Sequence, residues 1–173
     1  MNSTNEFVVL VDNADQEIGR MEKLEAHRLG KLHRALSVFV FNSDGQLLIH
    51  RRALEKYHSG GLWTNTCCSH PRPGENVADA AVRRLSEEMG MSCTLTRAFD
   101  FIYRAELDHE LTEHEFDHVF TGYSDQNPNP DPAEVMDWRW IGRNELLERL
   151  STHPEEFTAW FRIIAERAFR QGI

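Results

Sequence analysis

Long hydrophobic runs are absent from this 173-residue sequence, and so is any excess of basic charge. No apolar run approaches the roughly 18 residues that a membrane span needs, so we expect no membrane partner. Residues 1–10 contain neither a basic stretch nor a small-residue cleavage site, so we expect no secretory signal. The net charge of −9 argues against nucleic-acid binding, because that affinity comes from neutralised phosphates.

Cysteine is also scarce, and its arrangement is a poor disulfide framework. The three residues, Cys67, Cys68 and Cys93, are odd in number and two of them are adjacent. We therefore expect a cytoplasmic protein, in which a cysteine is catalytic, metal-bound or buried. Histidine, by contrast, is abundant, with nine residues.

Repeats, low-complexity tracts and long linkers are missing, and the length fits one domain over residues 1–173. Apolar periodicity and turn residues predict a hairpin (7–11 and 17–20), a short helix (23–29) and a second hairpin (35–41 and 46–50). A helix (76–89), three strands (94–106, 113–123, 137–141), a helix (144–150) and a last helix containing Trp160 follow. This irregular order predicts a mixed-sheet α/β sandwich rather than a regular βαβ repeat.

The predicted helix over 76–89 carries both an apolar and a charged face. Ala78, Ala81, Val82, Leu85 and Met89 recur at three- and four-residue steps, as on one face of an amphipathic helix. A glycine at position 90 is typical of a helix C-cap. Opposite this face lie Glu75, Arg83, Arg84, Glu87 and Glu88.

These charged positions resemble the Nudix signature, a loop-helix-loop that binds a divalent cation and a diphosphate. The matching residues are Glu75, Arg83, Leu85, Glu87, Glu88, Gly90 and Met91. Ser69 replaces the first glycine of the signature, and Arg84 replaces an acid that normally completes the metal site. The resemblance implies a Nudix-type mixed-sheet α/β/α sandwich with a degenerate loop-helix-loop and changed chemistry.

A second group of residues has the spacing of metal ligands. Cys68 and His70 lie two apart, and so do Glu113 and Glu115, so each pair shares a face of extended chain. Two further histidines, His27 and His33, lie on either side of the glycine at position 30. Three imidazoles with two carboxylates suit Zn²⁺, Mn²⁺ or Fe²⁺ better than Ca²⁺. Spacing alone leaves open whether these side chains bind metal or are structural.

Six segments together resemble the type I isopentenyl-diphosphate isomerases. They are 22–27, 32–33, 51–54, 61–71, 101–105 and 113–115. The stretch 63–71, with its Trp-Thr-Asn start and His-Pro end, is the most specific of them. The resemblance extends from about residue 7 to Trp160, nearly the whole chain.

This resemblance implies a role for each matching residue. The proton-transfer groups would be Cys68, Glu115 and Tyr103, with Cys68 chosen over Cys67 because family members carry the cysteine two residues before the histidine. A first divalent metal (Mn²⁺ or Zn²⁺, or Mg²⁺) would be held by His27, His33, His70, Glu113 and Glu115. A Mg²⁺ touching the substrate diphosphate would be held by Glu88 and the Cys68 carbonyl. Substrate contacts would come from Lys23, Arg52, Lys56, Arg84, Ser69 and Trp160.

The implied reaction interconverts isopentenyl diphosphate and dimethylallyl diphosphate through a tertiary carbocation, as in isoprenoid biosynthesis. It needs an acid, a base, a dry cavity and a π-surface near the cation. We expect Glu115 with Tyr103 to protonate the alkene and Cys68 to take the second proton. Trp160 either faces the cation or is a plain core aromatic.

Other interpretations remain open at this point. One is a Nudix diphosphohydrolase acting on a nucleotide-type diphosphate, and another is a module that only binds a diphosphate or a metal. The chain would be a monomer or a homodimer. We expect Cys67 and Cys93 to be structural, Arg51 and Arg83 to form surface or structural ion pairs, and the remaining six histidines to have no role in the site, most of them on the surface.

Overall fold

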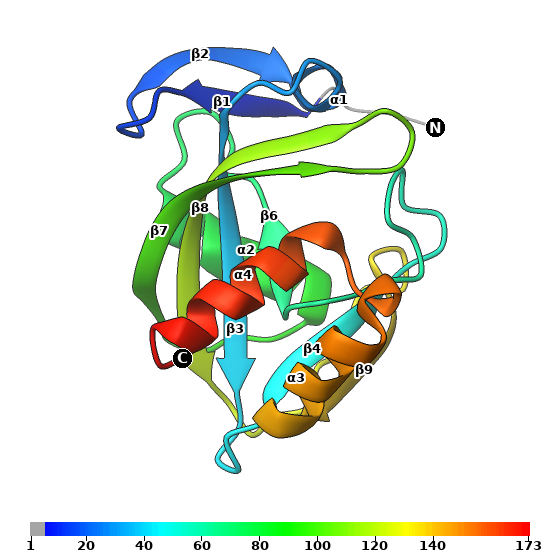
Figure 1. Ribbon diagram of the computed structural model, residues 1–173. Coiled ribbons are helices and arrows are strands. Elements are labelled where there is room, and N and C mark those ends of the chain that lie inside the picture. Colours follow the sequence, from blue (N-terminus) through cyan, green and yellow to red (C-terminus); the bar gives the residue numbers. More distant parts are fainter. Residues whose placement is uncertain (1–5) are drawn as a thin grey trace.

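The computed structural model describes residues 6–173 (Figure 1). The strands are β1 (Phe7–Val11), β2 (Glu17–Glu22), β3 (His33–Phe41), β4 (Leu47–Arg52), β5 (Trp63–Thr64), β6 (Cys67–Ser69), β7 (Leu95–Glu106), β8 (Thr112–Tyr123) and β9 (Val135–Ile141). The helices are α1 (Lys23–Arg28), α2 (Val77–Met89), α3 (Arg143–Thr152) and α4 (Ala159–Arg170), with a short 3₁₀ helix, Pro154–Glu156, before α4. Within the described range, no helix combines the length and apolarity that a bilayer crossing requires.

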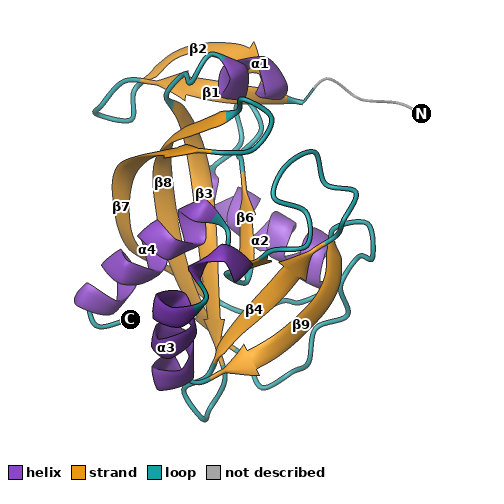
Figure 2. Cartoon of the chain, turned by 45° about the vertical axis from the view of Figure 1, so that its right-hand side comes forward, coloured by secondary structure: helices purple, strands orange, loops and turns teal. Residues whose placement is uncertain are grey.

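Strand β3 forms the centre of a mixed sheet between two helical layers (Figures 1 and 2). It pairs in parallel with β8 and antiparallel with β1 and β6. Its alternate side chains Leu36, Val38 and Val40 pack in a core with α2, whereas Phe39 packs in a second core with α4. The predicted α/β/α sandwich is therefore confirmed.

The hairpin predicted over 35–50 is present only at its turn. The register pairs Phe41 with Leu47, and beyond this point the two strands diverge. β3 pairs with β8 along its whole length, from His33 opposite Glu115 to Phe41 opposite Tyr123, and β4 pairs with β9. The turn residues correctly predicted the chain reversal between β3 and β4. Along the rest of their lengths, however, these two strands pair with strands that are distant in the sequence.

Helix α2 is confirmed, but its buried face is rotated from the predicted one. Its Ala81, Leu85 and Met89 are buried as expected, whereas Ala78 and Val82 are exposed. Buried Glu88 lies on the inward face instead. A purely hydrophobic pattern could not identify this carboxylate as inward-facing, and the rotation brings it to the site described below.

Gly90 ends α2 in a left-handed conformation that few other residues tolerate. Its φ is 60°, and an added Cβ would lie 2.2 Å from the Asn129 carbonyl oxygen. We expect Gly90→Ala to lower the free energy of unfolding by at least about 2 kcal/mol in urea titrations, because strain and a backbone clash add. The matched control is Gly45→Ala, where φ is 73° but nothing lies within 4 Å of the new Cβ. Equal losses in the two variants would contradict the clash.

Candidate active site

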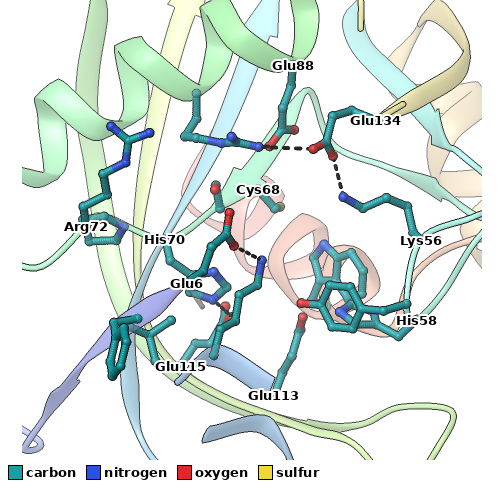
Figure 3. Close-up of a pocket in the computed structure, with 18 of the residues that line it drawn as sticks. Glu6, Lys56, His58, Cys68, His70, Arg72, Glu88, Glu113, Glu115 and Glu134 are labelled. Atoms are coloured by element: carbon teal, nitrogen blue, oxygen red, sulfur yellow. Dashed lines mark hydrogen bonds and ion pairs between the residues drawn. The ribbon is translucent and has the colours of Figure 1, made fainter. Parts of the chain in front are cut away.

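A cavity of about 790 Å³ opens between the β1–β2 end of the sheet, the loop before β5, β6 and α2. Figure 3 places Glu88, Glu134 and Lys56 at one end of the view and Glu113 and Glu115 at the other, with the Cys68 thiol between them. Twelve of the predicted site residues line it: Lys23, Arg52, Lys56, Cys68, Ser69, His70, Arg84, Glu88, Tyr103, Glu113, Glu115 and Trp160. The two others, His27 and His33, are fully buried.

His27, His33, His70 and Glu115 converge at one end of the cavity. One ligand atom from each lies within 4.8 Å of the others. Strand pairing explains the convergence, because His33 at the start of β3 lies opposite Glu115 in β8, and β6 delivers His70 beside them. The His70 Nε2 lies 2.9 Å from Glu115 Oε1 and 3.2 Å from His33 Nε2.

This cluster fits a divalent metal ion. The Nδ1 atoms of His27 and His33 lie 2.7 and 2.8 Å from backbone carbonyls and donate to them, so both Nε2 lone pairs face the cluster. The buried His27 Nε2 has no hydrogen-bond partner among the described residues. Burial lowers the pKa of His70 to about 3, which keeps this imidazole neutral as a ligand must be.

Glu113 lies outside this four-residue cluster, although it was predicted as part of it. It instead comes together with His27 and His58 in a neighbouring group of ligand atoms. His58 was expected to have no role, yet it is 3% exposed, lines the cavity and packs edge-on against Trp160 at 5.5 Å. Burial lowers its pKa to about 2. Only its proximity to the matched 61–71 segment could have suggested it.

Tyr103 bridges the two carboxylates of β8. Its hydroxyl lies 2.6 Å from Glu115 Oε2 and 2.9 Å from Glu113 Oε2. Burial and the nearby Glu115 raise the pKa of Glu113 well above its usual range. Burial would raise the pKa of Glu115 too, but the adjacent His33 and His70 imidazoles hold it well below the usual range. These opposite shifts favour the neutral form of Glu113 and the anionic form of Glu115.

The two adjacent cysteines face opposite sides of β6. Cys67 is fully buried in the core that packs against α2, as predicted. Cys68 lines the cavity, and its Sγ donates to Asn65 Oδ1 at 2.9 Å and lies 3.4 Å from Ser37 Oγ. Burial raises the pKa of this thiol well above its usual value, so the resting group is S–H. The predicted register, with Cys68 rather than Cys67 in the site, is consistent with these positions.

Charges alternate at the other end of the cavity. The Arg84 guanidinium lies 2.5 Å from buried Glu88 and 3.7 Å from Glu134. Lys56 Nζ lies 2.6 Å from the other Glu134 oxygen (Figure 3). Sequence reasoning missed Glu134, which stands in a loop 50 residues from Arg84. The Glu134 carboxylate pairs with two of the cations predicted to bind a diphosphate.

The remaining predicted cations and the tryptophan form the cavity wall. Lys23 Nζ pairs with Glu6 at 2.9 Å and lies over the Tyr57 ring. Arg52 lies over the Trp160 ring at 5.1 Å. Trp160 is 2% exposed, belongs to the core that includes α4 and also lines the cavity, so it is a core aromatic that stands at the cavity wall.

Residues expected to stand outside the site largely do so. Cys93 packs beside the α2 core, and Arg83 forms the expected ion pairs with Glu75 and Glu87, although it also lines the cavity. His50 and His118 are buried rather than on the surface. His50 contacts the Thr66 carbonyl, and burial lowers its pKa to about 4.

Comparison with known proteins agrees with this geometry. The NUDIX domain model matches residues 31–161. A Burkholderia multivorans protein named isopentenyl-diphosphate Delta-isomerase is 53% identical over 163 residues, covering 94% of this chain and 93% of that protein. A Pectobacterium atrosepticum protein of the same name is 53% identical over 92% of this chain and 89% of its own length.

Solved structures share the fold at lower identity. DR0079 from Deinococcus radiodurans superposes with a TM-score of 0.80 at 22% identity, covering 94% of this chain and 98% of that one. A MutT protein from Methanosarcina mazei gives 0.66 at 20% identity, covering 82% and 95%. The fold and the α2 loop-helix-loop define this chain as a Nudix-domain protein. Within that class, it belongs to the isopentenyl-diphosphate Delta-isomerase family.

Proposed function

We propose that the protein interconverts isopentenyl diphosphate and dimethylallyl diphosphate. The observation that carries this proposal is one cavity with a thiol, a Tyr103-linked carboxylate and a basic end. Moving an unactivated double bond requires a proton to be added at the terminal carbon and another removed from the carbon on the far side of the resulting tertiary cation. Two proton-carrying groups, the Cys68 thiol on β6 and the Glu115 carboxyl on β8, meet this need.

We assign proton transfer at the terminal carbon to Glu115, with Tyr103 as its hydrogen-bonding partner, and transfer at the other carbon to Cys68. In the isomerisation towards dimethylallyl diphosphate, Glu115 gives its proton to the alkene and Cys68 takes one from the cation. The resting pattern, S–H and carboxylate, is the starting state for the opposite direction. A turnover towards dimethylallyl diphosphate leaves this same pattern, so Cys68 must lose a proton to solvent and Glu115 must regain one from solvent before the next turnover in that direction.

The cavity wall protects the cation between these two steps. Trp160 is nearly fully buried and faces the cavity, where its π-surface stabilises a neighbouring positive charge. His58 packs against this ring and is kept neutral, so it adds no competing charge. Low exposure of these walls excludes water that would otherwise trap the cation.

Two metal positions accompany this chemistry. We assign a divalent ion, Mn²⁺ or Zn²⁺ (or Mg²⁺), to His27, His33, His70 and Glu115, with Glu113 beside them. Such an ion would fix the orientation of Glu115 and stabilise its negative charge. Glu88, with the Cys68 carbonyl, is assigned to a Mg²⁺ shared with the diphosphate, as hard cations prefer oxygen ligands. Lys23, Arg52, Lys56, Arg84 and Ser69 are the proposed diphosphate contacts.

A Nudix diphosphohydrolase is disfavoured by Arg84. It occupies the place of an acid that would complete the hydrolytic metal site, so that carboxylate ligand is missing. Incubation with isopentenyl diphosphate and Mg²⁺ separates the two activities. Dimethylallyl diphosphate without released phosphate supports the proposal, whereas phosphate release, or turnover of a nucleoside diphosphate derivative alone, contradicts it.

Removing the Glu134 carboxylate is expected to tighten diphosphate binding. Glu134→Gln frees Lys56 and Arg84 from a competing anion, so the Kd for inorganic diphosphate without Mg²⁺ should fall about three- to tenfold in isothermal titration calorimetry. Glu55→Gln, at an exposed neighbour of Lys56, makes the same change in net charge. Equal effects in both variants, or weaker binding by Glu134→Gln, would contradict direct competition.

The three cysteines are free thiols, which supports the cytoplasmic location that we propose. The proposed partner is a small diphosphate, with neither nucleic acid nor membrane involved. Either a monomer or a homodimer accommodates the site, because every residue assigned above comes from one chain.

A further inference from the structure

Asn65 occupies the short segment between β5 and β6, and all its hydrogen-bonding positions are used. It is fully buried. Its Nδ2 donates to the Val38 carbonyl at 3.1 Å and to the Cys67 carbonyl at 2.9 Å. Because both amide hydrogens are directed at carbonyls, the opposite orientation would bring oxygen against oxygen. The side chain therefore presents Oδ1, and only Oδ1, to the other side.

On that side, Asn65 Oδ1 accepts from the Cys68 thiol at 2.9 Å and from the Thr64 hydroxyl at 3.1 Å. Thr64 in turn accepts from the Thr158 hydroxyl at 3.2 Å. Thr158 caps helix α4, which carries Trp160, and its backbone N–H donates to the Trp63 carbonyl at 2.9 Å. A buried chain of side chains thus connects the thiol to the helix that forms the cavity wall.

We propose that Asn65 is a positioning residue that fixes the direction of the Cys68 thiol, and that Thr64 and Thr158 tie this contact to helix α4. The role rests on the proposed function, in which Cys68 transfers a proton to or from a substrate carbon. The χ1 torsion of Cys68 alone sets where its sulfur lies. Asn65 holds this torsion through its contact with the thiol on the side away from the cavity. The same amide anchors the Cys67 carbonyl, so the backbone beside Cys68 is held as well.

Positioning matters here because proton transfer to carbon tolerates little misplacement. A shift of about 1 Å at a reacting group can cost about 10²-fold in rate. The contact on the other side, Ser37 Oγ at 3.4 Å, is longer, and Ser37 donates to Asp117 at 2.8 Å. Asn65 therefore makes the shorter of the two contacts to the thiol.

The test compares Asn65→Ala with Thr66→Val. Thr66 is also fully buried in this segment and its hydroxyl also joins two backbone groups, the Val40 N–H and the Leu48 carbonyl, so its loss mimics the structural part of the change. We expect both variants to lose thermal stability. Only Asn65→Ala should lower kcat for isopentenyl diphosphate, by about 10- to 100-fold, with KM within about twofold. Equal kcat values in the two variants would overturn the proposal.

A spectroscopic measurement on the thiol itself does not require turnover. Its wild-type result also does not depend on whether a variant folds. The infrared S–H stretch of Cys68 is isolated in the substrate-free protein as the band lost in Cys68→Ala. We expect this band at the lower frequency of a hydrogen-bonded thiol in the wild type and in Thr66→Val, and at a higher frequency in Asn65→Ala. A free-thiol frequency in the wild type would overturn the proposal, even if the isomerase activity itself is confirmed. If isomerase activity is absent, the band still reports whether Asn65 holds the thiol.

Discussion

Cys68→Ala is expected to lower kcat by at least about 10²-fold, the lower range for loss of a proton-transfer group. Alanine removes the sulfur, and the cavity then lacks the group to which we assign transfer of the second proton. KM should change little, because the proposed diphosphate contacts come from other side chains. Steady-state rates with isopentenyl diphosphate, measured with the metal supply held constant, check this result.

The adjacent Cys67→Ala is the matched control. Cys67 is fully buried in the α2 core, so its truncation should cost stability, about 1 kcal/mol, without a comparable loss of rate. If Cys67→Ala is the inactive variant and Cys68→Ala turns over normally, the assignment of the catalytic cysteine is wrong by one residue. If both retain activity, a thiol is not required and the proposed proton acceptor must be another group.

Glu115→Gln is expected to have an effect as large or larger, between about 10² and 10⁴-fold in kcat. Glutamine preserves the shape of the side chain but cannot carry the transferred proton. It also replaces the oxygen that lies beside His70 and His33, so we expect the purified variant to hold less metal by elemental analysis. Loss of rate and loss of metal should therefore appear together in this variant.

Glu113→Gln distinguishes the two carboxylates of β8. Glu113 contacts Tyr103 and lies with His27 and His58 rather than in the four-residue cluster, and burial raises its pKa, which favours the neutral acid that glutamine imitates. We therefore expect a smaller loss of rate than in Glu115→Gln, together with retained metal. A loss from Glu113→Gln that equals or exceeds that from Glu115→Gln would show that the two roles are reversed or shared.

The local elements of this fold could be predicted from the sequence, whereas their long-range pairing could not. The periodicity of 76–89 and the glycine after it predicted α2 and its C-cap. The parallel pairing of β3 with β8 joins residues about 80 positions apart, and no turn residue encodes it. This explains why 35–50 was predicted as a hairpin, although the two strands share little more than their turn.

The site residues also divide into those that could be predicted from the sequence and those that could not. Residues inside recognisable motifs, such as Cys68, His70 and Glu115, were predicted and lie together. Two groups were missed, His58 beside Trp160 and Glu134 between the cations, because each acts through neighbours brought close only by the tertiary fold. The buried face of α2 is rotated so that Val82 is exposed and Glu88 faces the cavity. A pattern that scores only hydrophobicity could not predict this rotation.

The most direct test of proton addition and removal is turnover in D₂O. Isopentenyl diphosphate is incubated with the protein and Mg²⁺, and the dimethylallyl diphosphate is analysed by NMR and mass spectrometry. The account predicts deuterium in the methyl group formed from the terminal carbon, with no phosphate released and no labelling by Cys68→Ala above background. Product without deuterium from the solvent would contradict it, because the hydrogen would then have moved within the substrate rather than through Glu115 and Cys68.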